Sequence, residues 1–428
     1  MKNLQKKLET PLNYRKVKNM QVNSYVIQRN FYYDFNSESY STLFPNIHPY
    51  PATMLPQIGI GLLQEFNIKK GKLLDPYVGS GSSIVSALSV GIKNIDGFDL
   101  NPLAILISKV RTTIISTQDL NHLSKRYEEY LSNNLKENIN IPNITNINFW
   151  FSPIIINELA NIKYYIDLET NIDIKNFLLL VFSETVREVS YTRNSEFKLY
   201  KMAQDKINVF KPDARQTFIS KLKRNIKIFI DFYLPILKNN HSVCLKNTAF
   251  VKSQKKYNAV LTSPPYGDSR TTVAYGQFST LSNEWLGVES ARKLDSNLMG
   301  GHRIKDISNI DHCLKDTITK IWNVDPKRAT EVASFYTDLG SSIKEVSSAI
   351  LKNGYAIYIV GNRTVKDTFL NTDQFVAEQF CRNGFKHIIT YTRNISGKSM
   401  PLKNSPTNKA GKSSNTMTNE YIVILQKI

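Results

Sequence analysis

Short apolar runs alternate with amphipathic segments in the first part of the chain. Residues 72–75 and 94–99 are apolar enough for buried strands, whereas residues 54–66, 82–90 and 102–110 repeat apolar positions every three or four residues, as helices do. Strands that alternate with helices in this way form parallel sheets. The pattern therefore predicts a doubly wound α/β fold.

A long helical stretch then interrupts the alternation. Between residues 118 and 239 apolar residues recur at helical spacing, most clearly in residues 154–166, 174–189 and 218–237. We interpret this stretch as a helical subdomain inserted into the sheet-forming part of the chain.

The strand pattern returns in the second half of the chain. Five further strands are predicted at residues 242–246, 259–263, 355–360, 387–391 and 421–426. With the two earlier strands they make a seven-stranded sheet, whose last two strands form an antiparallel hairpin. The connection over residues 267–333 is long for two strands of one core, which is typical of a functional loop.

The composition fits a globular protein with a polyanionic partner. Hydrophobic residues make up 41% of the 428 residues, which suits a packed core and argues against wholesale disorder. The formal net charge of +19 suits nucleic acid, because clustered Lys and Arg side chains release counterions from phosphates. Lys, Asn and Ile are all abundant, as in proteins encoded by AT-rich genes, so part of the charge also fits solvated faces.

The cysteines and the N-terminal segment point to the compartment. Cys244, Cys313 and Cys381 have no paired spacing, so neither a disulfide framework nor a metal site is predicted. Residues 1–20 are polar and basic, and the longest apolar run, residues 177–182, is too short to span a bilayer. We expect a cytoplasmic protein without membrane contact.

The most informative motif is Ser263-Pro264-Pro265-Tyr266, which follows a predicted strand directly. Proline has no N–H and a nearly fixed φ, so a Pro-Pro step presents backbone carbonyl acceptors in a rigid frame. Such a corner can hold an amino group, and the ring of Tyr266 offers a flat face for a base. Taken alone, Pro-Pro-Tyr is also typical of a polyproline turn or of a ligand for a peptide-binding domain.

A second motif runs from Asp75 through Tyr77, Gly79 and Gly81, between a predicted strand and a predicted helix. Glycines let the backbone turn sharply and approach a ligand closely. Asp99 ends the next strand, where a carboxylate can accept both hydroxyls of a ribose. The motif indicates a nucleoside cofactor, although the third glycine of the dinucleotide-binding fingerprint is missing.

Together these motifs resemble those of the S-adenosylmethionine-dependent methyltransferases that modify exocyclic amines of DNA bases. That family has an Asp-Pro-Phe-x-Gly-Ser-Gly motif, which Asp75 to Gly81 match with Tyr77 in place of Phe. It also has Asp, Asn or Ser before Pro-Pro-Tyr or Pro-Pro-Phe, which Ser263 to Tyr266 match. A third segment, residues 48–52, resembles the one that lines the methionine pocket in the family.

The resemblance covers about two-thirds of the chain, residues 41–109 and 241–428. It implies a Rossmann-like methyltransferase sheet, with S-adenosylmethionine as the cofactor. The cofactor-binding residues that it implies are Asp75, Tyr77, Gly79, Gly81, Asp99 and Pro51. The catalytic residues that it implies are Ser263, Pro264, Pro265 and Tyr266.

These patterns divide the chain into four parts. Residues 1–40 are an N-terminal extension, and residues 41–110 are the cofactor-binding half of the methyltransferase core. Residues 111–240 are the inserted helical subdomain, a candidate for target recognition. Residues 241–428 are the catalytic half of the core, with the long loop over residues 267–333.

The resemblance implies methyl transfer to an exocyclic amine of double-stranded DNA, after the base leaves the stack. In this family Ser before the Pro-Pro pair mostly marks cytosine enzymes, so Ser263 predicts N4 of cytosine. Methylation at carbon 5 would need a cysteine after a proline, and none of the three cysteines follows one. A restriction endonuclease acting on the same site is the partner that this function implies. N6 of adenine, an RNA amine and silent nucleic-acid binding are the alternatives.

Other segments are candidates for nucleic-acid contact. Residues 183–194 could contact phosphates or base edges through Arg187, Ser190, Arg193 and Asn194. Glu184 and Arg187 equally suit an ion pair on an exposed helix face. Three more segments allow the same two interpretations, contact with nucleic acid or solvated surface. They are the basic residues 221–227, the polar and aromatic residues 267–278 beside the predicted base pocket, and the lysine-rich residues 396–419.

Overall fold

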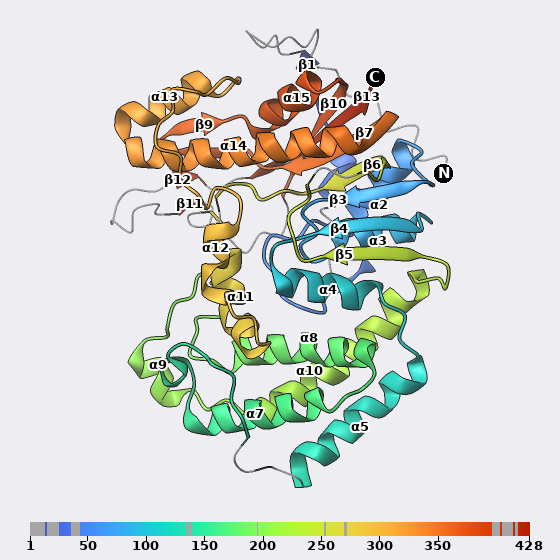
Figure 1. The fold of residues 1–428 in the computed structure, drawn as a ribbon, viewed down its shortest axis with the longest axis vertical. Helices are drawn as coiled ribbons and strands as arrows, with labels where there is room; N and C mark the ends of the chain where they lie inside the picture. Colours follow the sequence, from blue (N-terminus) through green and yellow to red (C-terminus); the bar gives the residue numbers. More distant parts are fainter. Residues whose placement is uncertain are drawn as a thin grey trace.

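A nine-stranded sheet forms the centre of the computed structural model (Figure 1). The structure describes residues 13–14, 25–35, 43–133, 136, 139–194, 196–251, 254–268, 272–395, 403–404, 414–415 and 418–428. In chain order the strands of the sheet are β1 (Asn13–Tyr14), β2 (Val26–Arg29), β3 (Lys72–Asp75), β4 (Asn94–Phe98), β5 (Ser242–Lys246), β6 (Tyr257–Thr262), β7 (Ile350–Val360), β10 (Phe385–Asn394) and β13 (Asn419–Lys427).

The strand order is β1–β2–β10–β13–β7–β6–β3–β4–β5. Strands β5, β4, β3, β6 and β7 are parallel to one another, and β13 is antiparallel to both β7 and β10. The seven strands from β10 to β5 are the seven that the sequence predicts. The doubly wound α/β fold with an antiparallel final hairpin is therefore confirmed.

The prediction of only seven strands is wrong at one edge of the sheet. Strand β2 pairs in parallel with β10, and β1 pairs antiparallel with β2. Both strands belong to the segment predicted as an N-terminal extension. Without β2, the backbone N–H and C=O groups on the outer side of β10 would be unpaired, so the added strand protects that edge. An apolar pair as short as Val26-Ile27 does not stand out as a strand in the sequence.

Helices cover both faces of the sheet. On one face lie α2 (Pro56–Glu65), α3 (Ser82–Ser89) and α4 (Pro102–Thr112), and on the other α13 (Lys315–Val324), α14 (Pro326–Ala349) and α15 (Thr372–Arg382). Successive residues of β6 supply the two cores in turn, since Ala259 and Leu261 pack on the first face and Val260 packs on the second. The motifs at the strand ends are thus held between two packed layers.

The inserted helices gather below the sheet in Figure 1. They are α5 (Thr117–Asn133), α6 (Ile147–Trp150), α7 (Pro153–Asp167), α8 (Ile172–Glu188), α9 (Gln204–Val209) and α10 (Ala214–Ile228), followed by a π-helical turn η3 (Phe229–Tyr233) and a short 3-10 turn η4 (Leu234–Ile236). The helix predicted up to residue 237 changes geometry before Pro235, which lacks the N–H that an α-helix needs. Helix α8 packs against α4 and joins the insert to the sheet layer.

The connection after β6 is largely helical and is not the irregular loop that its length indicates. It contains α11 (Tyr275–Trp285), η5 (Ala291–Lys293) and α12 (Leu294–Asn297) before α13 and the first turns of α14. Helix α11 is buried along nearly its whole length, because it packs against α8 and α4. Its polar residues Ser279, Ser282 and Asn283 are buried in these contacts, which hides the helical pattern in the sequence.

The segment after β10 is described only in part. In this segment, β11 (Lys403–Asn404) and β12 (Ser414–Asn415) form an antiparallel ladder. A second short ladder, β8 (Arg363–Val365) with β9 (Thr368–Leu370), lies before β10 in the chain. Several residues predicted to contact nucleic acid lie outside the described residues, namely Ser269, Arg270, Thr271, Lys398, Lys409 and Lys412. Within the described part of the chain, no helix combines the length and the apolar character that a membrane crossing requires.

An exposed Glu184–Arg187 ion pair is not formed. Arg187 is buried, where it donates to the carbonyl oxygens of Phe278 at 3.1 Å and of Glu196 at 2.5 Å and lies over the Phe278 ring. Glu184 instead pairs with Lys221 at 2.8 Å and with Arg224 at 2.7 Å, across two helices. Both predictions for Arg187, phosphate contact and surface pairing, are therefore wrong, because α11 covers this face of α8.

Candidate active site

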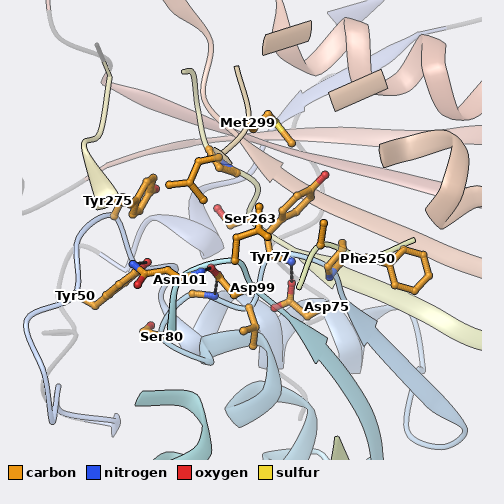
Figure 2. A pocket seen from close by; sticks show the side chains of 18 of the residues that line it. Tyr50, Asp75, Tyr77, Ser80, Asp99, Asn101, Phe250, Ser263, Tyr275 and Met299 are labelled. Atoms are coloured by element: carbon orange, nitrogen blue, oxygen red, sulfur yellow. Dashed lines mark hydrogen bonds between the residues drawn. The ribbon is translucent and has the colours of Figure 1, made fainter. Parts of the chain in front are cut away.

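The two sequence motifs meet at one edge of the sheet. Strands β6, β3 and β4 are neighbours and run in the same direction, so their carboxyl ends lie side by side. A pocket of about 340 Å³ opens there, and Asp75, Asp99 and Ser263 all line it (Figure 2). Residues that are 188 positions apart in sequence, Asp75 and Ser263, thus share one cavity.

Asp75 connects the glycine turn to the strand before the Ser-Pro-Pro-Tyr corner. Its carboxylate accepts hydrogen bonds from the Tyr77 N–H at 3.0 Å, from the Thr262 hydroxyl at 2.6 Å and from the Ser83 hydroxyl. Burial raises the pKa of Asp75 to about 6, and these three bonds oppose that rise. Because Thr262 directly precedes Ser263, Asp75 holds the end of β6 in register with the cofactor motif.

The two glycines of the turn have different roles. Gly79 has a φ of +49°, and a Cβ placed there would find no atom closer than 3.8 Å, so its position faces open pocket space. Gly81 has a φ of +84° and is the N-cap of α3, where a Cβ would come within 2.9 Å of Ser108 Oγ. Gly81 does not line the pocket, and its lack of a side chain lets α3 and α4 approach each other.

Asp99 lies at the end of β4 and faces the pocket. One carboxylate oxygen accepts from the Gly79 N–H at 2.9 Å, and the other accepts from the Asn101 N–H at 2.8 Å. Burial raises the pKa of Asp99 to about 6, which the two backbone bonds partly offset. Asp99 therefore fixes the glycine turn and still has lone pairs for a ligand.

Tyr50, Asn101 and Tyr275 form one wall of the pocket. Tyr50 belongs to the predicted pocket segment 48–52 and Tyr275 to residues 267–278, but the sequence patterns do not identify Asn101 or bring the three residues together. The Asn101 side chain caps α4 and donates to the Tyr50 hydroxyl at 3.0 Å and to the Ser279 hydroxyl at 2.7 Å. The rings of Tyr50 and Tyr275 are stacked with centroids 5.9 Å apart, and both line the pocket. Asn101-Pro102 is a recognisable helix start, but nothing local in the sequence connects it with α11.

Only part of the segment over residues 48–52 lines the pocket. Pro51 and Ala52 line it, whereas His48 does not line it and is buried with its ring edge-on to Phe278. Tyr77 lines the pocket, and its hydroxyl donates to Ser342 on α14. The lining also includes Phe250, Met299, His302 and Asp338.

The Ser-Pro-Pro-Tyr corner directly follows the carboxyl end of β6. Ser263 and Pro265 line the pocket, Pro264 is buried, and Tyr266 is half-buried beside the pocket without being part of its lining. Burial, with Glu420 nearby, holds the pKa of Tyr266 well above its usual value, so this side chain stays a neutral phenol. Glu420 is a further residue of this site that the sequence analysis missed.

Other chemistries find little support among the described residues. No group of three His, Cys, Asp or Glu side chains there could hold a metal ion. The described residues that line the pocket include no cysteine, and Cys244, Cys313 and Cys381 are free thiols elsewhere. What the pocket offers is a glycine turn, the three carboxylates of Asp75, Asp99 and Asp338, and a proline-framed acceptor corner.

A doubly wound sheet with an antiparallel strand near its edge, together with this pocket at its carboxyl edge, defines the class of the protein: it is a methyltransferase, and S-adenosylmethionine is its cofactor. The chain is 37% identical to the type II methyltransferase M.MvaI of Kocuria varians, over 93% of this chain and 94% of that protein. It therefore belongs to the type II methyltransferases and is a DNA methyltransferase.

Further similarities are weaker. The type II methyltransferase M.MjaII of Methanocaldococcus jannaschii is 27% identical over 48% of this chain and 38% of that protein. Among solved structures, the rRNA methyltransferase aviRa of Streptomyces viridochromogenes aligns with 88% of this chain and 87% of its own, at 9% identity and a TM-score of 0.30. No model of a known protein family matches the chain.

Proposed function

We propose that this protein methylates N4 of cytosine in double-stranded DNA, as the modification enzyme of a restriction system. The observation that supports the proposal most strongly is the shared pocket, in which Ser263 and Pro265 lie beside Asp75 and Asp99. An amine held by the Ser263 corner would lie next to a cofactor held at the two carboxylates. A cognate endonuclease and a cytoplasmic location belong to the same proposal.

S-adenosylmethionine fits the donor side of this pocket. We assign the ribose hydroxyls to Asp99, whose carboxylate has lone pairs beyond its two backbone bonds. Gly79 lets the ligand approach the backbone, and Pro51 and Tyr77 contact it as walls. Asp75 and Gly81 act by building the turn. When bound, the cofactor supplies an electrophilic methyl group on a positively charged sulfur.

The acceptor side is the corner that follows β6. The base must leave the DNA stack to enter it. The Ser263 hydroxyl and the Pro264 carbonyl would accept the two hydrogens of the base amine, which favours a pyramidal and more nucleophilic nitrogen. We propose that the half-buried ring of Tyr266 stacks on the extruded base. Holding the nitrogen next to the methyl donor is the main contribution of the protein to the rate.

The target atom can be tested by product analysis. We expect DNA methylated by the enzyme to yield N4-methylcytosine after digestion to nucleosides and separation by mass. Ser263 supports cytosine by resemblance alone, since the same corner could hold the amine of adenine. N6-methyladenine as the sole product would contradict the cytosine assignment and leave a DNA amino-methyltransferase, and methylation of tRNA in preference to duplex DNA would contradict the choice of substrate.

The inserted helices are our candidate for DNA contact and target recognition. Of the four residues predicted to contact DNA there, Arg193 and Asn194 are exposed, whereas Arg187 and Ser190 are buried. Arg193 is paired with Glu196 at 3.2 Å, an exposed interaction that costs little to exchange for a phosphate. Lys221, at the start of the basic run on α10, is buried against Glu184, so that run offers less charge than its sequence indicates.

Salt dependence tests whether the net charge of +19 serves DNA binding. We expect DNA affinity to fall by at least about tenfold between 50 and 200 mM salt, which corresponds to about two neutralised phosphates. Fluorescence anisotropy with a labelled duplex would measure it, and cofactor affinity over the same range is the control. A DNA affinity that does not change with salt would mean that the excess charge is only solvated surface.

A further inference from the structure

A chain of hydrogen bonds leads from the pocket to a buried ion pair. The Ser263 hydroxyl donates to the Tyr266 hydroxyl at 3.2 Å, and the Tyr266 hydroxyl donates to Glu420 Oε1 at 2.9 Å. The other oxygen of Glu420 pairs with the Arg393 guanidinium. Four side chains from the β6 corner, β13 and β10 are thus connected in series.

The ion pair is held rigidly in the sheet. Arg393 and Glu420 are direct cross-strand partners on β10 and β13. The Arg393 side chain is 3% exposed, and its Nε donates to the Tyr33 carbonyl at 2.6 Å. Arg393 can only donate, so the Glu420 carboxylate is the acceptor in this pair.

The charge at one end sets the direction of every bond in the chain. An ionised carboxylate can only accept, so Tyr266 must donate to Glu420. The Tyr266 oxygen then accepts the Ser263 hydrogen, as the geometry has it. Ser263 has no other hydrogen bond to a described residue, so its hydroxyl lone pairs are left for the pocket that it lines.

We propose that Glu420, held by Arg393, is a positioning residue that keeps the Ser263 hydroxyl turned as an acceptor toward the target amine. The inference rests on the proposed function, because it concerns the group that Ser263 receives. It extends that function by a selection rule: the corner accepts a base that presents an amine and opposes one that presents a carbonyl oxygen at the same place, as uracil does in place of cytosine.

Glu420→Gln should reverse the chain. The amide oxygen of glutamine would face the Arg393 donors, and its NH2 group would face Tyr266. Tyr266 would then donate to Ser263, and the Ser263 hydrogen would point into the pocket against the amine. We expect kcat to fall by about 10- to 100-fold, the effect of losing a hydrogen bond and placing two donors together, with the KM for the cofactor unchanged.

Tyr266→Phe separates this effect from a structural one. It keeps the ring but removes the connecting hydroxyl, so Ser263 can rotate freely, and we expect kcat to fall by only about 2- to 10-fold. Without the Tyr266 hydroxyl, Glu420 is no longer linked to Ser263, so Glu420→Gln cannot reverse the hydrogen bond of Ser263. The double variant should therefore be as fast as Tyr266→Phe alone. A loss from Glu420→Gln that persists undiminished in the Tyr266→Phe background would overturn the inference.

Glu65→Gln is the matched control. The Glu65 carboxylate accepts from the hydroxyls of Tyr33 and Tyr391 near the same sheet edge but does not line the pocket, so this variant should keep the wild-type kcat. Thermal melting would verify that each variant folds. If Glu420→Gln does not fold, Tyr266→Phe decides alone, and an unchanged kcat then overturns the inference.

A binding measurement adds an independent criterion. Duplexes that carry uracil in place of the methylated cytosine should bind the wild-type enzyme more weakly than the cytosine duplex, and Glu420→Gln should reduce this difference. An equal difference in both proteins would contradict the selection rule. The wild-type product is determined first: an enzyme that methylates no DNA contradicts the proposed function, whereas an active enzyme with independent Glu420 and Tyr266 effects contradicts only the inference.

Discussion

Replacing Ser263 with alanine is expected to lower the rate of methyl transfer by at least about 100-fold, the usual cost of removing one hydrogen bond that acts on the reacting atoms. Ser263 is the only side-chain acceptor of the corner that both lines the pocket and follows β6 directly. Cofactor affinity should not change, because the hydroxyl contacts Tyr266 and not the glycine turn. Single-turnover transfer of a labelled methyl group to duplex DNA would measure the rate.

Ser89→Ala is a suitable control for this experiment. The Ser89 hydroxyl donates to the Val85 carbonyl at 2.7 Å within α3, and the residue does not line the pocket, so the same atomic change there should leave the rate intact. A Ser263→Ala enzyme that transfers methyl groups at the wild-type rate would remove Ser263 from the site. The acceptor corner would then consist of the Pro264 carbonyl alone.

Asp99→Ala is expected to weaken binding of S-adenosylmethionine by about 1–3 kcal/mol, or roughly 5- to 150-fold, because a ribose acceptor and the partner of two backbone N–H groups are lost together. Those groups belong to Gly79 and Asn101, so the glycine turn and the start of α4 would both lose support. Isothermal titration calorimetry would measure the affinity. DNA binding should survive, since Asp99 lies inside the pocket.

Asp99→Asn separates the two contributions. Its amide oxygen can still accept one backbone N–H, whereas its NH2 group would oppose the other, so we expect an affinity between those of the wild type and the alanine variant. Thermal melting of each variant would show whether the fold is retained. A folded Asp99→Ala protein with unchanged cofactor affinity would show that the ribose is held elsewhere in the pocket.

Much of the fold could be predicted from the sequence because its signals are local. Most of the core strands are short continuous apolar runs, as strands buried on both faces are, and such runs are visible without knowledge of their neighbours. The two motifs also consist of consecutive residues. The strand assignment places each of Asp75, Asp99 and Ser263 at the carboxyl end of a strand, and the strand order β6–β3–β4 brings these ends together at one edge.

Only the tertiary structure decided which side chains complete the site. Glu420 lies 154 residues after Tyr266, and it reaches the corner because β13 inserts between β10 and β7. Arg187 looks like an exposed helical residue until α11 packs over it, and β2 becomes a strand because β10 offers it an unpaired edge. Such partners are chosen by burial and by hydrogen-bonding groups that lack a partner, and these arise from the packing of distant elements, so no local pattern of the sequence contains them.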